Sequence, residues 1–314
     1  MGAKIFKSMD KVSIVMSTYN ERLDHLSLAI ESIIKQTYKN IEFIILLDNP
    51  QNRSIKRLVQ SYAEKDYRIK IIANKKNIGL TASLNKGFRL ASGNYFARMD
   101  ADDISDCERI DYELIYLKKE NVDLVGCMTR RIDENGIVVN KLANPTKSTE
   151  FLSKKIRFDN CIAHPTWLFK KEVYEKINGY REIKTAEDYD FLLRLVRAKY
   201  KIGICDKCLL SYRISPSGIS RSNSLKQLLT SRILQKNFNN INDINQSIID
   251  SKICNKITMQ SNENFEKGVQ LIDKAVEQLK KKDFMAIVNI AKALLSSHYI
   301  WIKLYQLFRI HTII

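Results

Sequence analysis

The amino-acid sequence predicts an α/β protein with a doubly wound, mainly parallel sheet, helices on both faces of that sheet and a helical C-terminal region. Short buried apolar runs alternate four times with helical patterns over about a hundred residues, which is typical of such sheets. Several of these runs end in polar residues, as strands do where they lead into ligand-binding loops. Near residue 225, Asn, Gln, Ser and Ile become frequent, and we therefore expect two domains, 1–222 and 223–314.

Hydrophobic periodicity places the elements in order. The first four strands are expected at 12–17, 41–47, 69–72 and 94–99. Apolar residues at helical spacing predict helices that end near residues 34, 62 and 90, between those strands. The second half of this domain is expected to contain a helix at 111–119, strands at 124–127 and 166–169, and a helix that begins near Ala186. The run Asp133-Glu134-Asn135-Gly136 is typical of a hairpin turn.

Polar side chains stand at the carboxyl ends of three of the predicted strands. They are Ser17, Asp48 and Asp100, from well-separated parts of the chain. In doubly wound sheets, ligands bind beyond the carboxyl ends of the strands. We therefore expect these three positions to meet in one crevice, which a set of unrelated solvated turns would not predict.

An acidic cluster follows the fourth predicted strand. Asp100, Asp102 and Asp103 place three carboxylates within four positions. Such carboxylates repel one another unless a cation lies among them, and Mg²⁺ or Mn²⁺ commonly bridges one or two carboxylates to substrate phosphates. This pattern favours a metal-diphosphate site. The alternative for an isolated Asp-x-Asp is a solvated acidic turn that caps the next helix.

Composition limits the classes of partner. The chain has 314 residues, with 52 Lys and Arg against 35 Asp and Glu, a formal net charge of +17. This balance favours anionic partners such as nucleic acid, acidic lipid or phosphorylated substrates. No basic run is interleaved with aromatic residues and no zinc-finger spacing occurs, so nucleic acid is not an expected partner. The six cysteines fit no disulfide scaffold and residues 1–11 lack an apolar core, so we expect a cytoplasmic protein.

The last stretch, from Phe284 to Ile314, is strongly apolar and is expected to form a helix. Its polar residues step by three, four or seven and form a narrow stripe: Asn289, Lys292, Ser296, Lys303, Gln306 and Arg309. Asn289 and Lys292 interrupt the apolar run too early for a good membrane-spanning helix. Two interpretations stay open, a helix that packs on its own domain or in a homo-oligomer, and a helix that lies on a membrane surface.

Several motifs in this chain resemble those of glycosyltransferase family 2, a large inverting family with the GT-A fold. They cover about residues 11–220 and comprise 13–20 (SIVMSTYN), 36–42 (QTYKNIE), 77–80 (NIGL), 84–87 (LNKG), 98–104 (RMDADDI) and 186–190 (AEDYD). The resemblance is specific because these motifs agree with the family in order and in spacing. The subgroup that the chain resembles builds bacterial capsule, O-antigen and lipooligosaccharide chains from nucleotide sugars.

The resemblance implies a nucleotide pocket along the strand ends. Ser17 and Tyr19 would line this pocket, and Asp48 would accept a hydrogen bond from the base, expected to be uracil. Asn77 lies in the loop that would close over the nucleotide. The full set implied to contact the donor is Ser17, Tyr19, Glu21, Asp48, Asn77, Lys86, Asp100 and Arg213.

The resemblance also implies a metal site and a catalytic base. Asp100 would contact the ribose or the metal, and Asp102 would ligate the Mg²⁺ or Mn²⁺ that bridges the diphosphate. Asp188, or alternatively Glu187, would be the catalytic base on the acceptor hydroxyl. An inverting transfer is one in-line displacement, so the attacking hydroxyl needs a carboxylate within reach, and the metal neutralises charge on the departing nucleoside diphosphate.

The sequence departs from the family pattern in two places. Residues 48–51 read DNPQ where the family often has Asp-Asp-Gly-Ser, which bears on the contact to the base. Many members have a His after the Tyr-Arg pair, but here Arg213 is followed by Ile214. Arg213 either helps to hold the diphosphate or forms a surface ion pair. His164 either touches the acceptor or leaving group or is a structural histidine.

We therefore expect a metal-dependent hexosyl- or N-acetylhexosaminyltransferase that moves a sugar from a UDP-sugar to a saccharide acceptor. The acceptor would be linked to a polyprenyl lipid, and the enzyme would work at the inner face of the cytoplasmic membrane. The alternatives are a nucleotidyltransferase that acts on sugar phosphates, a basic nucleic-acid-binding protein and an inactive scaffold. A nucleotidyltransferase usually carries a Gly-rich loop with Arg and Lys after the first strand, and residues 17–21 have neither feature.

Overall fold

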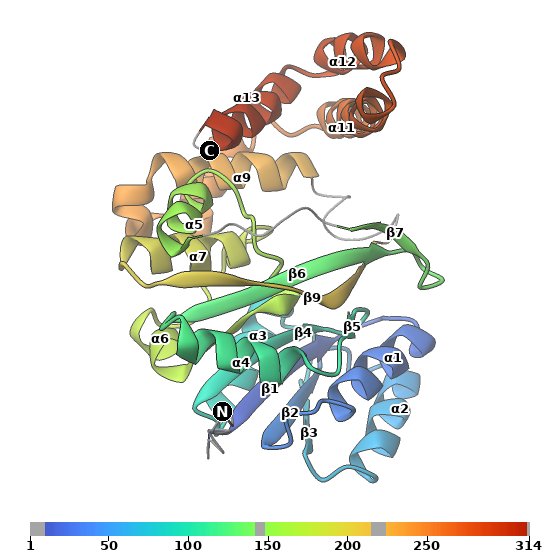
Figure 1. Cartoon of the computed structure of the whole chain (residues 1–314), viewed down its shortest axis with the longest axis vertical. Coiled ribbons are helices and arrows are strands. Elements are labelled where there is room, and N and C mark those ends of the chain that lie inside the picture. Colours follow the sequence, from blue (N-terminus) through green and yellow to red (C-terminus); the bar gives the residue numbers. More distant parts are fainter. Residues whose placement is uncertain (1–9, 142–147, 215–223, 313–314) are drawn as a thin grey trace, which may run out of the picture. The chain divides into compact units, whose positions relative to one another are not determined.

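The computed structural model of the chain describes residues 10–141, 148–214 and 224–312 (Figure 1). The chain divides into two compact units. The first unit comprises Met1–Ser153, Ile162–Arg181 and Ala198–Ile214, and the second comprises Lys154–Cys161, Glu182–Arg197 and Ser215–Ile314. The predicted domain boundary between residues 222 and 223 lies outside the described residues.

The first unit is built on a nine-stranded sheet with the order β3-β2-β1-β4-β8-β6-β9-β5, in which β7 pairs with β6. Its strands are β1 (Val12–Thr18), β2 (Ile41–Leu47), β3 (Ile69–Ala73), β4 (Tyr95–Asp100), β5 (Ile104–Ser105), β6 (Leu124–Ile132), β7 (Val138–Lys141), β8 (Leu168–Lys170) and β9 (Ile202–Arg213). The first four strands pair in parallel, as predicted. Beyond β4 the sheet is mixed, because β8 pairs antiparallel with β4 and β6.

Helices cover both faces of the parallel strands. Alternate residues of β1, namely Val12, Ile14 and Met16, form one core with α1 (Leu23–Ile34), α2 (Arg53–Ala63) and α4 (Arg109–Lys119). The opposite face packs against α3 (Leu80–Leu90). There a Cβ atom on Gly87 would come within 2.6 Å of the side chain of Val15, so only glycine allows this close approach.

The remaining short helices are α5 (Thr149–Ile156), the 3₁₀ helix η1 (His164–Thr166) and α6 (Lys171–Lys176). The predicted strand at 166–169 begins later, at Leu168, because Pro165 and its neighbours form η1. The long strand β9 was not predicted. Its burial pattern does not alternate cleanly, since its register with β6 shifts near Met128, and a shifted register breaks the period of two.

The second unit is helical in its described part. It contains α7 (Glu187–Arg197), α9 (Ser224–Lys236), the 3₁₀ helix η2 (Phe238–Asp243), α10 (Gln246–Ile253), α11 (Met259–Lys280), α12 (Met285–Ser296) and α13 (His298–Thr312). The predicted continuous helix from Phe284 is wrong, because the chain breaks at Ser297 between α12 and α13. Within the described residues, no single helix has the length and apolar character to cross a membrane. In that part of the chain, one bent pair, Met285–Ser296 with His298–Tyr305, meets the criterion together, at an angle of 119°.

A buried carboxylate joins the strands at the edge opposite to their carboxyl ends. Glu42 in β2 is 2% exposed. Its Oε1 accepts hydrogen bonds from Ser13 Oγ at 2.5 Å and from Ser92 Oγ at 2.9 Å, and its Oε2 accepts one from Lys70 Nζ at 2.6 Å. Burial by itself raises the pKa of Glu42, but these hydrogen bonds outweigh it and lower the pKa to about 2.

We expect Glu42→Gln to lower the free energy of unfolding at pH 7 by about 2–3 kcal/mol. The carboxylate stabilises the fold above its unfolded pKa, and this contribution disappears as the pH falls through about 2. The difference between wild type and variant should therefore shrink at pH 3 in urea titrations. Glu64→Gln, at an exposed position in the loop after α2, serves as the control. An equal cost at both pH values would contradict this account.

Candidate functional site

Four polar positions lie along one edge of the parallel sheet. Ser17 in β1 pairs in register with Asp100 in β4. Asp48 follows β2, and its backbone N–H donates to the carbonyl of Thr18 at 2.9 Å. Asn74 follows β3, and its backbone N–H donates to the last carbonyl of β2 at 2.9 Å. The strand ends that carry the predicted residues therefore meet at this edge.

The acidic turn after β4 is crowded with negative charge. Asp100 forms an ion pair with the buried Arg98. Burial raises the pKa of Asp102 to about 7, and the neighbouring Asp100 and Glu21 carboxylates add to the increase. Burial also raises the pKa of Asp103 well above its usual value, with Asp100 and Asp102 contributing. A cation among these groups would relieve their repulsion.

The acidic turn is held in place by β9. The backbone N–H of Arg213 donates to Asp103 Oδ1 at 2.7 Å, and its Nε donates to the carbonyl of Asp102 at 2.8 Å. Its Nη1 donates to the carbonyls of Asp133 and Glu134 in the turn between β6 and β7, at 2.8 and 3.1 Å. Arg213 is 5% exposed, which excludes the surface ion pair considered from the sequence.

The donor set of this turn fits a hard divalent cation. Asp103 Oδ2 is buried and has no hydrogen-bond partner in the described part of the chain. Within the same residues, no group of three or more His, Cys, Asp and Glu is arranged to hold a metal ion by itself. Mg²⁺ usually keeps several waters and takes one or two carboxylates plus substrate phosphates. Asp100 and Asp102 therefore suit a cation that is shared with a phosphorylated ligand.

Asp48 organises the loop that leads into α3. Its Oδ1 accepts hydrogen bonds from Asn74 Nδ2 at 2.8 Å and from the Ile78 N–H at 2.9 Å, and its Oδ2 accepts one from the Gly79 N–H at 2.9 Å. Gly79 has φ = 84°, a left-handed conformation that favours glycine. Each carboxylate oxygen has two lone pairs, so Oδ2 retains the capacity to accept from a ligand.

Asn74 is a functional candidate that the sequence reasoning missed. Its Nδ2 also donates to Ser83 Oγ at 2.9 Å, and its Oδ1 accepts from Lys86 Nζ at 2.8 Å. Lys86 thus reaches Asp48 through Asn74. The predicted loop residue Asn77 accepts from the Gly79 N–H at 2.9 Å and stabilises the same turn. The signal available in the sequence was a polar residue directly after a buried strand.

Residues after β1 form a second part of this edge. Glu21 Oε2 accepts hydrogen bonds from Thr18 Oγ1 at 2.5 Å and from the Tyr19 N–H at 2.8 Å. The Tyr19 side chain is 44% exposed. Asn20 Oδ1 accepts from Asn49 Nδ2 at 2.6 Å, which ties this loop to the one after β2. Tyr19 is therefore presented to solvent by a loop that is fixed through its backbone.

Two buried arginines support the acidic turn, and neither was predicted as a site residue. Arg98 donates to the Met99 carbonyl and to Asp100. Arg109 in α4 donates from Nη1 to the carbonyls of Arg98, at 3.2 Å, and of Pro165. For Arg98, the sequence signal of a functional role was an Arg inside an apolar strand. The role of Arg109 depends on contacts between distant segments.

His164 lies in a buried aromatic cluster. Its Nε2 is 2.8 Å from the Tyr180 hydroxyl, and its ring centroid is 4.6 Å from that of Trp167. Burial, with a smaller effect of the Arg98 charge, lowers the pKa of His164 well below its usual value. These contacts favour the structural interpretation of His164.

Asp188 and Glu187 lie in the second unit, at the start of α7. Asp188 Oδ2 accepts a hydrogen bond from Asn160 Nδ2 at 2.7 Å, and its Oδ1 accepts from the Tyr189 N–H at 2.7 Å. Both carboxylates are half-buried, whereas Asp190 is fully buried and forms an ion pair with Arg194. The catalytic role of Asp188 or Glu187 stays a prediction.

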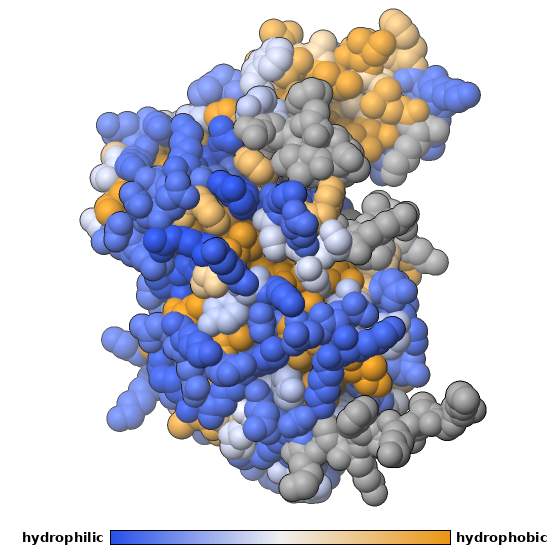
Figure 2. Space-filling view, turned by 60° about the vertical axis from the view of Figure 1, so that its left-hand side comes forward, coloured by the Kyte–Doolittle hydropathy of each residue, from blue (hydrophilic) through white to orange (hydrophobic). Residues whose placement is uncertain are grey.

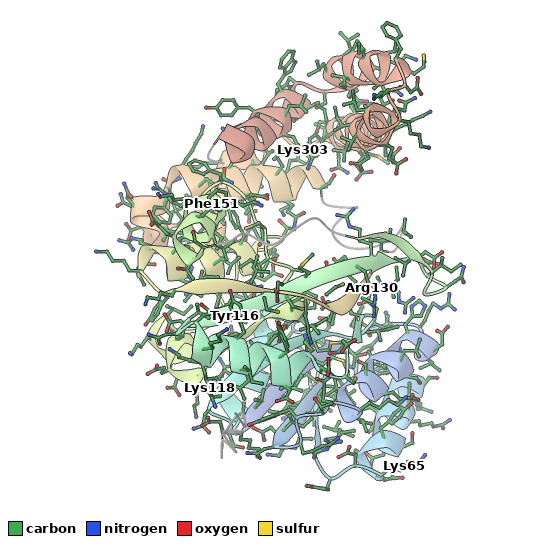
Figure 3. All side chains as sticks on the ribbon, viewed as in Figure 1. Lys65, Tyr116, Lys118, Arg130, Phe151 and Lys303 are labelled. Carbon is green, nitrogen blue, oxygen red and sulfur yellow. The ribbon has the colours of Figure 1, made fainter. Side chains whose placement is uncertain are left out.

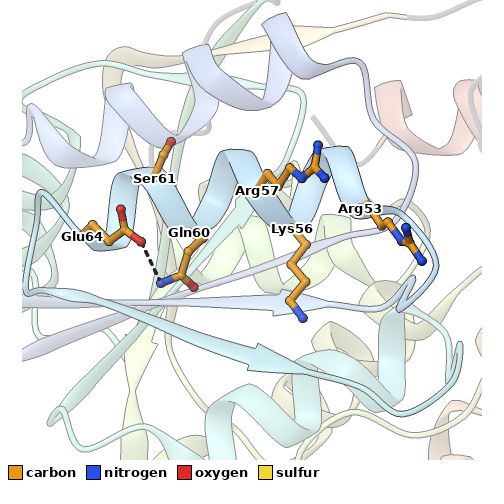
Figure 4. Close-up of a pocket in the computed structure, with 6 residues that line it drawn as sticks. All are labelled: Arg53, Lys56, Arg57, Gln60, Ser61 and Glu64. Carbon is orange, nitrogen blue, oxygen red and sulfur yellow. Dashed lines mark hydrogen bonds between the residues drawn. The ribbon is translucent and has the colours of Figure 1, made fainter.

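A shallow hollow also runs along α2 (Figure 4). It is lined by Arg53, Lys56, Arg57, Gln60, Ser61 and Glu64. None of these is a predicted site residue, and Gln60 and Glu64 are joined by a hydrogen bond of 3.3 Å. The hollow is a basic surface of one helix and contains none of the residues placed at the edge of the sheet.

Comparison with known proteins identifies the family. Residues 13–177 match the family described as Glycosyl transferase family 2. An uncharacterized glycosyltransferase of Methanocaldococcus jannaschii is 36% identical over 209 residues, 66% of this chain and 72% of that protein. The O-antigen biosynthesis glycosyltransferase WbnJ of Escherichia coli is 34% identical over 218 residues, 68% of this chain and 84% of that protein.

Solved structures share the fold at low sequence identity. The Staphylococcus aureus protein TarS in complex with UDP-GlcNAc has a TM-score of 0.57 at 15% identity, over 91% of this chain and 89% of that one. The mannosyltransferase of Pyrobaculum calidifontis in complex with GDP-Man and Mn²⁺ has a TM-score of 0.59 at 13% identity, over 93% and 88%. The predicted GT-A fold is thereby confirmed. By the family match and these relatives, the chain belongs to glycosyltransferase family 2.

Proposed function

We propose that this glycosyltransferase moves a hexosyl or N-acetylhexosaminyl group from a UDP-sugar to a saccharide acceptor and depends on a divalent metal. The observation that carries the proposal is the meeting of the Asp48 loop and the crowded acidic turn at one edge of the sheet. The Asp48 loop offers hydrogen-bond acceptors for a nucleobase, and the acidic turn offers carboxylates for a cation. Family membership favours sugar transfer over nucleotidyl transfer.

The donor would lie across the strand ends. Asp48 Oδ2 would accept a hydrogen bond from uracil, with Ser17 and the exposed Tyr19 beside the nucleoside. Lys86 would hold Asn74 and thereby Asp48 in position. Because this network is buried and linked through several hydrogen bonds, it would be preorganised before the donor binds.

Asp100 and Asp102 would hold Mg²⁺ or Mn²⁺ against the diphosphate. The metal, when bound, would neutralise the charge that develops on the departing nucleoside diphosphate. Arg213, which is already bonded to the turn that carries these carboxylates, would keep them in position. Its buried Nη2, which has no hydrogen-bond partner in the described residues, adds positive charge near the same turn.

The acceptor hydroxyl would be activated by Asp188, with Glu187 as the alternative. Asp188 would take the hydroxyl proton as the oxygen forms a bond to the anomeric carbon. The bond from that carbon to the diphosphate oxygen breaks in the same displacement, so the configuration inverts. Asn160 would orient the carboxylate through its hydrogen bond to Asp188 Oδ2.

The expected acceptor is a growing surface polysaccharide on a polyprenyl lipid. The E. coli relative is named for O-antigen biosynthesis, and a relative in Erwinia amylovora is named for amylovoran biosynthesis. A lipid-linked acceptor would require the enzyme to work at the inner face of the cytoplasmic membrane as a peripheral protein. A screen of UDP-sugars and GDP-sugars for metal-dependent hydrolysis, with and without polyprenyl-linked acceptors, tests donor and acceptor together. Activity only with GDP-sugars would overturn the assignment of uracil.

We expect Asp102→Asn to abolish metal-dependent donor use while the protein remains folded. The variant removes one metal ligand and also one of three mutually repelling carboxylates, so its melting temperature should not fall. EDTA should inactivate the wild-type enzyme in the same assay. Asp206→Asn, at an exposed position on β9, is the control and should retain activity. Full transfer by the wild type in EDTA would rule out the metal.

We expect Asp188→Asn to lower the rate of transfer by about 10²–10⁴-fold and to leave binding of the donor nearly unchanged, because a general base acts on the acceptor. The measurement is kcat with saturating donor, alongside calorimetric titration with UDP. Glu187→Gln is the matched control on the same helix turn. If Glu187→Gln loses activity and Asp188→Asn keeps it, Glu187 is the base.

A further inference from the structure

The helix α12 packs through an unusual face. Its buried residues are Ala286, Asn289 and Ala293, each at most 5% exposed. The fully buried residues of this helix are thus two small side chains and one amide, while Val288, Ile290 and Leu294 are half-buried. Asn289 Nδ2 donates to Gln278 Oε1 on α11 at 2.7 Å. Asn289 belongs to the polar stripe noted in the sequence, so that stripe partly faces the protein.

The opposite side of α12 is apolar and exposed to solvent. Phe284, Ile287 and Leu295 are 73%, 58% and 88% exposed. At 100° per residue these three positions fall on one side of the helix, roughly opposite to the buried side. A surface helix of a globular protein normally shows the reverse arrangement, with its apolar side inward. Hydrophobic side chains gather over the C-terminal helices at the top of Figure 2.

Aromatic residues are also exposed on α13. Trp301 and Tyr305 lie four residues apart and are 60% and 50% exposed. Trp and Tyr are enriched where one end of the side chain meets lipid and the other meets water. Positions four apart share a helix face, so α13 presents two such side chains together.

The charge of this region selects the partner. Residues 281–314 contain five Lys and Arg against one carboxylate, Asp283. Lys281 and Lys282 are exposed in the turn before α12, and Lys303 belongs to α13 (Figure 3). A second copy of the chain would bring the same positive charge against this surface. An anionic lipid bilayer offers both an apolar interior and the complementary charge.

We propose that the outward side of α12, together with Trp301 and Tyr305, is a docking surface for anionic lipid, on which α12 lies in the plane of the interface. Phe284, Ile287 and Leu295 enter the acyl boundary, and the lysines contact the headgroups. The inference deepens the proposed use of a lipid-linked acceptor. Binding to lipid itself requires neither donor nor metal, so it is measured independently of transfer.

The test compares the full chain with a triple variant, Phe284→Ser, Ile287→Asn and Leu295→Gln. The matched control is Tyr67→Ser, Ile115→Asn and Leu90→Gln, three apolar positions on the first unit that are 93%, 60% and 56% exposed. Sedimentation with vesicles of phosphatidylglycerol and phosphatidylcholine measures binding. We expect the triple variant to bind more than tenfold more weakly and the control to bind as the wild type does.

A charge variant tests the lipid class. Lys281→Gln with Lys282→Gln should weaken binding to anionic vesicles by about fivefold per lysine. Wild-type binding to pure phosphatidylcholine should be far weaker. If the triple variant sediments with the vesicles as strongly as the wild type does, the proposal is overturned. A dimeric wild type that does not sediment and becomes monomeric in the triple variant would also overturn it.

Packing within the protein is tested by thermal stability. All three substituted side chains are exposed, so the triple variant should melt within a few degrees of the wild type. Leu295→Gln alone, at the most exposed of the three positions, provides a second reading if the triple variant is unstable. If that single variant binds vesicles as the wild type does but melts at a lower temperature, the surface contributes to the stability of the protein and not to lipid binding. Loss of transfer with vesicle binding intact would count against the proposed function alone.

Discussion

The crowding of negative charge after β4 is the constraint on which the rest of the site depends. Asp100, Asp102 and Asp103 cannot all remain ionised near one another in a partly buried turn without compensation. The buried Arg98 forms an ion pair with Asp100, and the backbone N–H of Arg213 donates a hydrogen bond to Asp103. These contacts hold the turn in place but leave the pKa values of Asp102 and Asp103 raised, so a bound cation would favour their ionised forms.

Buried carboxylates at the two edges of the sheet have pKa values that are shifted in opposite directions. At the amino-terminal edge, Glu42 is satisfied by two serines and a lysine, and its pKa is lowered to about 2. At the carboxyl edge, the acidic turn leaves Asp103 Oδ2 unpaired within the described residues and its pKa is raised. The first arrangement stabilises the fold. The second retains unfavourable interactions that a ligand can relieve, as functional sites often do.

The helical second unit shows why an amphipathic pattern is ambiguous. A stripe of polar residues on an apolar helix does not reveal which side faces the protein. In α12 the amide of Asn289 is satisfied by Gln278, so a polar residue is buried while Phe284 and Leu295 remain in solvent. The fully buried residues of α12 are small or polar, so Ile287 and Leu295 stay exposed while Ile290 and Leu294 are only half-buried.

The sequence by itself determined the parallel half of the sheet and the residues at its edge. Strand periodicity and the polarity of strand ends are local signals, so β2 was placed at its observed bounds, α3 at its observed end, and Asp48 and Asp100 at the edge of the sheet. The tertiary structure alone decided the long β9 and the bend at Ser297, because registers and helix breaks depend on distant partners. It also decided the roles of Asn74 and Arg109, whose meaning lies in hydrogen bonds between segments far apart in the chain. Residue types and their local pattern identify candidate site residues, whereas the contacts between them are formed only in the tertiary structure.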